Sequence, residues 1–177
     1  MKELVTGGAG YIGSHTVLSL LNNNYNVVVY DNLSNSSVES IARVEKLTGK
    51  SVALVEGDVC DKDKLSEVFD QYNIDAVIHF AALKAVGESA QIPLSYYQNN
   101  VYGSLCLLEV MQQHDVDNFI FSSSATVYGE ENDVPYVETM RLGTPSSPYG
   151  ASKVMVERVL ADFACSDSNF RGVSLRY

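Results

Sequence analysis

Tyr149 and Lys153 stand four residues apart in a segment whose apolar residues predict a helix over 149–163. Residues at this spacing share one face of a helix. An ammonium group beside a phenol favours the phenolate and so lowers the phenol pKa from about 10. Such a tyrosine can remove the proton of an alcohol near neutral pH. In isolation the same spacing usually marks a surface pair, so the surrounding sequence decides its meaning.

A run of three serines precedes this pair. Ser122, Ser123 and Ser124 end a segment that predicts a strand over 118–122. Ligands of open parallel sheets bind at the carboxyl ends of the strands. A serine hydroxyl at that edge can hydrogen-bond an alcohol oxygen that is being oxidised to a carbonyl. The alternative is that the serines only cap a helix or form a strand-end loop.

A glycine-rich turn, Thr6-Gly7-Gly8-Ala9-Gly10-Tyr11-Ile12-Gly13, follows the first predicted strand and opens the first predicted helix. Gly8, Gly10 and Gly13 match G-x-G-x-x-G, and Gly7, Gly10 and Gly13 match the wider G-x-x-G-x-x-G spacing. Glycines allow a tight turn and a close approach of the backbone to a pyrophosphate, which the helix N-terminus attracts. In this strand–turn–helix context the pattern predicts a dinucleotide site. A bound nicotinamide cation would also favour the phenolate of Tyr149.

Two aspartates follow later strands. Asp31 lies 18 residues after Gly13, at the end of the second predicted strand. A carboxylate there can accept from both ribose hydroxyls and would repel a 2′-phosphate, which favours NAD over NADP. Asp31-Asn32 also has the composition of a turn, and both interpretations can hold together. Asp58 ends the third strand, where it either meets an adenine or belongs to a plain turn.

The elements that must position these residues alternate along the chain. Strands are predicted at Glu3–Thr6, Asn26–Tyr30, Ser51–Glu56, Ala76–Phe80, Asn118–Ser122 and Gly172–Arg176. Helices are predicted at Tyr11–Asn22, Val38–Thr48, Lys62–Tyr72, Leu94–His114 and Tyr149–Phe163. Near-continuous apolar strands alternating with helices predict an α/β fold, a doubly wound parallel sheet (Rossmann fold) covered on both faces. Six strands fit the order 3-2-1-4-5-6.

Composition excludes several classes of protein. The 177 residues favour one domain, and the formal net charge of −10 disfavours a nucleic-acid partner. No apolar run approaches the length of a membrane span, and the N-terminal residues lack the pattern of a signal peptide, so a cytoplasmic protein is expected. Cys60, Cys106 and Cys165 are isolated and odd in number. They fit neither a disulfide framework nor a zinc site, and no metal is expected.

Longer strings resemble one family. The glycine turn continued by Ser14-His15, the Tyr149-x-x-x-Lys153 pattern and Ser124 are shared by the extended short-chain dehydrogenases/reductases. His79-Phe80-Ala81-Ala82-Leu83-Lys84-Ala85-Val86-Gly87-Glu88-Ser89 and Phe121-Ser122-Ser123-Ser124-Ala125-Thr126-Val127-Tyr128-Gly129 are more specific and resemble the UDP-glucose 4-epimerase family within it. The resemblance covers essentially the whole chain.

The resemblance implies roles for individual residues. Tyr149 would be the general base and acid, Lys153 would bind the nicotinamide ribose and tune Tyr149, and Ser124 would contact the reacting sugar hydroxyl. The implied NAD site comprises Gly7, Gly10, Tyr11, Ile12, Gly13, Asp31, Asn32, Asn35, Ser36, Asp58, Val59, Phe80, Ala81, Ala82, Lys84, Asn99, Ser122, Tyr149, Lys153 and Tyr177. The implied UDP-sugar contacts are Lys84, Ser124, Ala125, Thr126 and Tyr149.

The implied reaction inverts C4 of a UDP-hexose by transient oxidation to a 4-keto sugar, with NAD regenerated in each cycle. The chain departs from the family in two ways. Ala82 stands where these epimerases usually carry glycine, and the family continues past Tyr177 into a substrate domain that the sequence lacks. Residues 1–177 are therefore expected to be the NAD-binding domain that carries the catalytic residues, and to be inactive alone.

Two other functions remain open. A nucleotide-sugar 4,6-dehydratase or decarboxylase would need an acid/base group where this chain has Ala125 and Thr126. A non-catalytic NAD-binding protein would not need Tyr149, Lys153 and Ser124 together. The full-length protein is expected to be a homodimer, because the helices over 94–114 and 149–163 carry apolar residues on more than one face. These residues are Val101, Leu105, Leu108, Val110, Met111, Val154, Met155, Val156, Val159 and Leu160.

Overall fold

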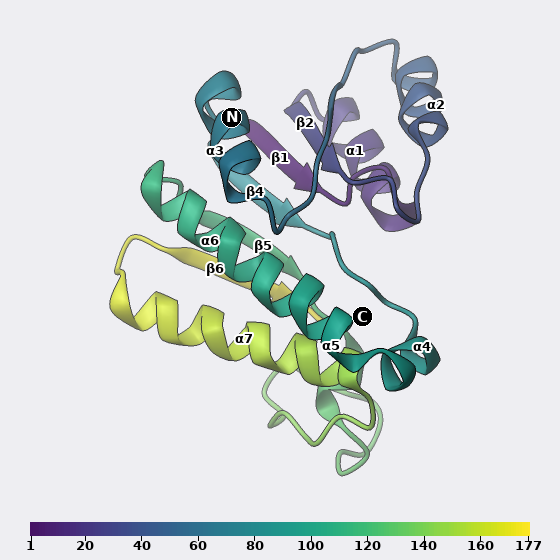
Figure 1. Cartoon of the computed structure of the whole chain (residues 1–177), viewed down its shortest axis with the longest axis vertical. Coiled ribbons are helices and arrows are strands. Elements are labelled where there is room, and N and C mark those ends of the chain that lie inside the picture. Colours follow the sequence, from purple (N-terminus) through teal and green to yellow (C-terminus); the bar gives the residue numbers. More distant parts are fainter.

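Six parallel strands form one sheet in the order β3-β2-β1-β4-β5-β6 (Figure 1). The computed structural model describes all 177 residues. The strands are β1 (Lys2–Thr6), β2 (Asn26–Asp31), β3 (Ala53–Glu56), β4 (Ala76–His79), β5 (Asn118–Ser122) and β6 (Arg171–Leu175). The order reverses between β1 and β4, which is where a doubly wound sheet opens a crevice for a ligand. The predicted α/β class and strand order are confirmed.

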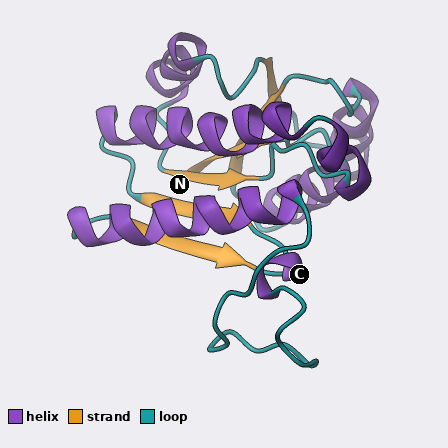
Figure 2. Ribbon diagram, turned by 60° about the horizontal axis from the view of Figure 1, so that its bottom comes forward, coloured by secondary structure: helices purple, strands orange, loops and turns teal.

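The helices are α1 (Tyr11–Asn22), α2 (Val38–Thr48), α3 (Lys62–Tyr72), α4 (Val86–Gln91), α5 (Pro93–Tyr96), α6 (Gly103–Gln113) and α7 (Pro148–Ser166). A π-helix, η1 (Tyr97–Tyr102), joins α5 to α6, and a 3₁₀-helix, η2 (Ala125–Tyr128), follows β5. The loop between η2 and α7 extends away from the sheet (Figure 2).

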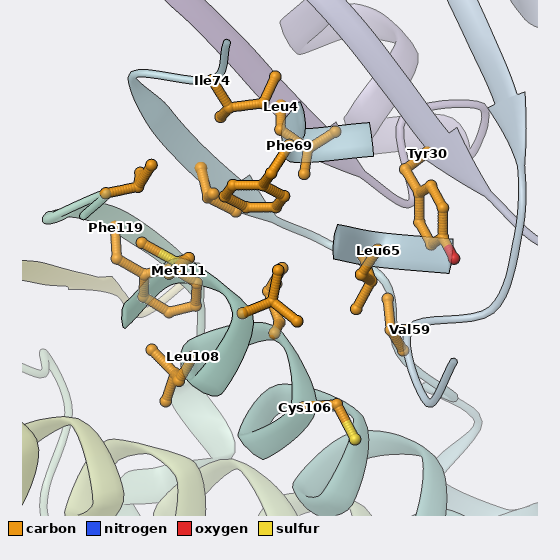
Figure 3. Packing of buried hydrophobic residues seen from close by; sticks show 14 of the residues in the cluster. Leu4, Tyr30, Val59, Leu65, Phe69, Ile74, Cys106, Leu108, Met111 and Phe119 are labelled. Carbon is orange, nitrogen blue, oxygen red and sulfur yellow. The ribbon is translucent and has the colours of Figure 1, made fainter. Parts of the chain in front are cut away.

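Side chains at alternate positions of the strands point to opposite faces of the sheet and belong to two separate hydrophobic clusters. Leu4 of β1 belongs to a cluster under α3, α6 and α7, whereas its neighbour Val5 belongs to a smaller cluster under α1 and α2. Figure 3 shows the larger cluster, in which Phe69 of α3 and Met111 of α6 pack near Phe119 of β5. The sheet is thus sandwiched between helices, which holds the carboxyl ends of the strands at one rigid edge.

The face of the sheet opposite α7 is only partly covered. Val173 and Leu175 of β6 point to that face and are 53% and 42% exposed. Arg171 and Gly172 are exposed as well, so β6 forms an open edge of the sheet.

Local signals explain the helices that sequence reasoning placed correctly. The Ser37 hydroxyl accepts from Glu39 N and caps α2, and the Asp61 carboxylate accepts from Lys64 N and caps α3. Gly49 and Asn73 end these helices in the left-handed conformation. The predicted bounds of α1, α2 and α3 are confirmed. Helix α7 extends the prediction at both ends, because Ser147 caps it and Pro148 fits its first turn.

The prediction of one continuous helix over 94–114 is wrong. The chain forms α5, η1 and α6 there, and the wider π turn carries Asn99 and Asn100. The buried Asn100 side chain bonds the backbone N and O of Leu83 and the hydroxyl of Ser152. These tertiary bonds accompany the π turn, and such turns are frequent at functional sites.

Smaller differences concern strand ends and two short helices. Strand β3 begins at Ala53 instead of Ser51, β4 ends at His79 instead of Phe80, and β6 covers Arg171–Leu175 instead of Gly172–Arg176. Helices α4 and η2 were not predicted, because each is too short to show a periodic pattern.

Candidate active site

A cleft opens at the carboxyl edge of the sheet and is lined by the segments that follow all six strands. It is lined by Gly7, Gly10, Tyr11, Ile12, Gly13, Tyr30, Asp31, Asn32, Ser34, Asn35, Gly57, Val59, Phe80, Ala81, Ala82, Leu83, Lys84, Asn99, Ser122, Ser123, Tyr149, Lys153 and Tyr177. Most of the residues expected at a dinucleotide site therefore come together. Five expected residues do not line the cleft: Ser36, Asp58, Ser124, Ala125 and Thr126.

The glycine loop has the geometry of a phosphate cradle. Gly7 takes a positive φ of 68°, and its N–H donates to Tyr30 O at 2.8 Å. A Cβ on Gly13 would collide with the Gly7 carbonyl oxygen and lie 2.7 Å from Gly8 Cα, so the turn closes only without side chains. No side chain caps α1, whose N-cap is Gly10. The first amides of α1 therefore remain available to an anion such as a pyrophosphate.

Asp31 serves both as turn former and as cleft residue. The residue is 6% exposed, and its carboxylate accepts from Ala9 N at 2.9 Å, from Leu33 N at 2.9 Å and from Ser36 Oγ at 2.7 Å. Asp31 thus fixes the glycine loop against the end of β2, and Ser36 acts through it. Both of the interpretations offered for this aspartate are compatible with the geometry.

Asp58 lies one layer further out. Its carboxylate accepts from Asn32 Nδ2 at 3.0 Å and from Cys60 N at 2.9 Å. Burial raises the pKa of Asp58, but these hydrogen bonds outweigh it and hold the pKa below its usual range. The neighbouring Val59 lines the cleft. Asp58 thus orders the turn after β3. Of the two interpretations offered for Asp58, an adenine contact or a plain turn, these contacts match the turn.

Lys153 is buried at the base of the cleft. It is 4% exposed, and its Nζ donates to the carbonyl oxygen of Ser122 at 2.8 Å. The same Nζ lies 4.7 Å from the centroid of the Phe121 ring and 5.8 Å from that of the Tyr149 ring. Burial lowers the pKa of Lys153 to about 8.

Ser124 lies beside Tyr149 at the edge of the cleft, close enough for its hydroxyl to act on the pKa of the phenol. Burial raises the pKa of Tyr149, Ser124 lowers it, and Tyr177 raises it again, with a net increase above its ordinary value. Within the chain, burial therefore outweighs the lowering of the Tyr149 pKa that was expected from Lys153, and the contribution expected from a nicotinamide cation stays a prediction. Sequence spacing could not anticipate this, because it carries no information on how deeply the phenol is buried.

The serine loop orients the Ser124 hydroxyl. Its Oγ accepts from Thr126 Oγ1 at 3.0 Å and from Thr126 N at 3.3 Å. Since the oxygen accepts twice, its own proton is free to be donated. Ala125 N donates to Tyr177 O at 3.1 Å, and the Tyr177 hydroxyl lies 2.6 Å from Ser122 Oγ. Ala125 and Thr126 thus hold Ser124 and Tyr177 in place.

A buried polar network around His79 lies under the cleft and was not predicted from the sequence. His79 Nδ1 lies 2.6 Å from Thr6 Oγ1, and His79 Nε2 lies 2.9 Å from Ser104 Oγ. Because Ser104 Oγ donates its proton to Asn100 O, the His79 Nε2 must carry the hydrogen and Nδ1 accepts from Thr6. Burial, aided by the charge of Lys153, lowers the pKa of His79 to about 3, so the ring is neutral. The network ties the glycine loop to η1 and, through Asn100, to Ser152 of α7.

Five residues of the lining were also missed as site residues: Tyr30, Ser34, Gly57, Leu83 and Ser123. Leu83 and Ser123 lie inside the strings that carried the family resemblance, so their position was a usable signal. Gly57 packs against the Tyr30 ring, where a Cβ would clash, and only the structure shows this.

No group of three or more His, Cys, Asp or Glu side chains is placed to hold a metal ion. No helix has the length and apolar character needed to span a bilayer.

The sheet order, the glycine loop and the Tyr149–Lys153 pair together define an extended short-chain dehydrogenase/reductase with a Rossmann fold. The chain belongs to the family described as GDP-mannose 4,6 dehydratase, whose model matches residues 4–174.

Individual relatives within this family point to one activity. The chain is 60% identical over 177 residues to a UDP-glucose 4-epimerase of Erwinia amylovora, covering 100% of this chain and 52% of the relative. It is 55% identical to the UDP-glucose 4-epimerase of Yersinia enterocolitica, again over 100% of this chain and 53% of the relative. The crystal structure of the Bifidobacterium longum UDP-glucose 4-epimerase in complex with NAD⁺ and UDP superposes with a TM-score of 0.98 at 49% identity, covering 100% of this chain and 53% of that one. The chain thus spans about half the length of the relatives it matches.

Proposed function

We propose that these 177 residues are the cofactor-binding and catalytic half of an enzyme that inverts C4 of a UDP-hexose, interconverting UDP-glucose and UDP-galactose. The observation that carries the proposal is the grouping of Ser124, Tyr149 and Lys153 beside a dinucleotide cleft. Support comes from the relatives named UDP-glucose 4-epimerase, which match the whole of this chain. The uridine nucleotide would be held mainly by the half of the enzyme that follows in those relatives.

The residues at the cleft fit NAD. The uncapped start of α1 and the closed glycine turn suit a pyrophosphate, and the Asp31 carboxylate suits an unphosphorylated ribose. Lys153 and Asn99 lie at the opposite end of the lining, with Tyr177, where a nicotinamide ribose would reach them. When bound, NAD supplies the acceptor for the hydride that leaves the sugar and the donor that returns it.

Residues of this chain would transfer the proton of the sugar 4-hydroxyl. Tyr149, as phenolate, removes the proton of the 4-hydroxyl while the C4 hydride departs and the C4–O bond becomes a carbonyl. Ser124 donates its free proton to the same oxygen in a hydrogen bond. After the 4-keto sugar turns its other face, the hydride returns to C4 and Tyr149 gives the proton back. The net redox change is zero.

Burial of Tyr149 works against the phenolate and has to be offset. Positive charge near the phenol does this, and both Lys153 and the oxidised cofactor carry it. Ser124 contributes in the same direction, because its hydroxyl lowers the pKa of Tyr149.

A dehydratase is the main rival, since the family is described by that activity. Elimination of the 6-hydroxyl requires an acid/base group beside the serine. Ala125 and Thr126 occupy those positions, and Thr126 is engaged in bonds to Ser124. This loop therefore favours epimerisation over dehydration.

The cofactor preference is tested by calorimetry with NAD(H) and NADP(H) on the full-length enzyme. Full-length here means a protein of the relatives' length, for example this chain joined to the second half of the Erwinia amylovora relative. NAD(H) should bind more tightly, and Asp31→Ala should narrow the difference. NADP(H) binding as tight as NAD(H) binding in the parent would refute the role of Asp31.

The full-length enzyme is proposed to be a homodimer. The chain itself buries Leu108, Val110 and Met111 of α6 and Val156 and Leu160 of α7, whereas Leu105 and Met155 remain 36% and 47% exposed. This leaves a smaller apolar face than the sequence indicated, formed by these two side chains and by the partly buried Val101, Val154 and Val159. Light scattering at micromolar concentration should give twice the protomer mass, and a monomer would count against the dimer.

A cytoplasmic location is proposed on the ground that all three cysteines are free. Cell fractionation should recover the protein with cytoplasmic markers, and recovery with a secreted fraction would contradict the assignment.

The proposed activity is tested by following conversion of UDP-galactose to UDP-glucose by the full-length enzyme. Conversion without consumption of added NAD is expected, together with no loss of water from the sugar. Formation of a 4-keto-6-deoxy sugar would favour the dehydratase instead. Residues 1–177 alone should bind NAD weakly and convert nothing, because the relatives named UDP-glucose 4-epimerase are about twice as long.

A further inference from the structure

A partly buried ion pair lies behind the candidate site, on the same face of α7 as Tyr149 and Lys153. Tyr149, Lys153 and Glu157 follow one another at intervals of four residues. The Glu157 side chain is 6% exposed, and its carboxylate binds Arg176 through two bonds, Nε to Oε1 at 3.0 Å and Nη2 to Oε2 at 2.7 Å. This carboxylate holds the pKa of Arg176 above its usual range.

The pair reaches the serine loop through a third bond. Ser123 Oγ donates to Glu157 Oε1, and Ser123 itself is 2% exposed. The residue on each side of Ser123 acts at the cleft, because the Ser122 carbonyl accepts from Lys153 and Ser124 lies beside Tyr149 and lowers its pKa. Glu157 therefore fixes the middle of the three-serine run.

The other partner reaches the end of β6 and the helix η2. Arg176 precedes Tyr177, whose carbonyl accepts from Ala125 N. Arg176 Nη1 donates to the Tyr128 hydroxyl at 3.2 Å, and its guanidinium lies 5.2 Å from the centroid of the Tyr128 ring. One carboxylate on α7 thus connects the end of β5, the end of β6 and η2.

Buried ion pairs add little net stability, because desolvation of both charges offsets their attraction. A gain in stability is therefore a weak explanation for three hydrogen bonds, one buried and two partly buried, that converge on one carboxylate. Their effect on geometry is direct, since Ser123 and Arg176 are covalent neighbours of Ser124 and Tyr177. Displacements near 1 Å of such groups can cost about 10²-fold in rate.

We propose that Glu157 is a positioning residue for the reaction, which holds Ser124 and Tyr177 in register with Tyr149 through Ser123 and Arg176. The proposal rests on the function proposed above. Glu157 touches neither substrate nor cofactor in this assignment, and its influence passes through the two residues that it binds.

Ser123→Ala is the sharpest test, because it removes the bond to the serine loop and leaves the Glu157–Arg176 pair intact. Ser66→Ala is the matched control, since Ser66 Oγ also bonds a single side chain, His114, away from the cleft. In the full-length enzyme Ser123→Ala should lower kcat about tenfold, with the KM for UDP-galactose within about twofold of the parent. The acidic limb of the kcat profile should move to higher pH, because a displaced Ser124 no longer lowers the pKa of Tyr149.

A second readout does not depend on catalysis. The pKa of Tyr149 is measured by NMR of ¹³C-labelled tyrosine, with the Tyr149 signal assigned from Tyr149→Phe. It should rise in Ser123→Ala and in Glu157→Gln, and should match the parent in Ser66→Ala. If Glu157→Gln does not fold, Ser123→Ala decides the question alone.

Failure of the proposed function and failure of the positioning role give different results. A parent that converts no UDP-galactose refutes the proposed function, and the NMR titration still decides whether Glu157 positions Ser124. A Ser123→Ala enzyme that matches Ser66→Ala in kcat and in the pKa of Tyr149 overturns the positioning role, even when its thermal stability is reduced.

Discussion

The Lys153 ammonium donates to the backbone carbonyl of Ser122 at 2.8 Å, so the helix that carries Tyr149 and Lys153 is bonded directly to the end of β5. The bond joins α7 to the strand that presents the serine loop. Lys153 is nearly fully buried, and this carbonyl compensates part of the cost of placing its charge there.

Lys153→Met should therefore do more than remove a charge. It should lower turnover by about 10²-fold or more and also weaken NAD binding, because in the proposed site one ammonium serves the phenol and the cofactor ribose as well as the Ser122 carbonyl. Steady-state rates and calorimetry on the same preparation separate the two effects. Unchanged NAD affinity in the variant would show that Lys153 does not contact the cofactor.

The glycine loop should tolerate no side chain at Gly13. A Cβ there collides with the Gly7 carbonyl oxygen, so Gly13→Ala should open the turn and weaken NAD binding by at least about tenfold. Gly87→Ala is the control, because a Cβ on Gly87 meets nothing within 4 Å. The two variants are compared by NAD titration, and equal affinities would remove the argument for a closed phosphate turn.

His79 should make the fold sensitive to mild acid. Burial lowers its pKa from 6.5 to about 3 in the folded chain, whereas the unfolded chain titrates near 6.5. Between those values the unfolded state binds a proton that the folded state does not, so stability falls as the pH drops. At pH 5 the loss is about 2 kcal/mol.

Urea midpoints at pH 7 and pH 5 measure this loss. His79→Gln should be less stable than the parent at pH 7 but should lose less on acidification. A variant whose midpoint shifts by as much as the parent's would show that His79 does not carry the pH dependence.

Much of the fold was predictable because its signals are local. Ser37 and Asp61 cap α2 and α3 in the structure as their residue types favour, and the glycine turn opens α1 where the pattern placed it. The apolar runs of Leu4–Val5 and Val27–Val29 are buried on both sides, as a parallel sheet requires.

What the sequence could not reveal depends on partners far along the chain. Asn100 bonds Leu83 and Ser152, and the π turn that carries it resembles an ordinary helix in periodicity. The Glu157 carboxylate meets Ser123 from β5 and Arg176 from β6, 34 and 19 residues away. The raised pKa of Tyr149 depends on burial that spacing does not encode.

The most direct test of the central claim is the rate of UDP-galactose to UDP-glucose conversion by the full-length enzyme and its Tyr149→Phe variant. The phenylalanine keeps the ring and its packing but removes the group that transfers the proton. Turnover should fall by about 10²–10⁴-fold while NAD binding stays nearly unchanged. A variant that keeps more than about a third of the parental rate would show that Tyr149 is not the general acid/base.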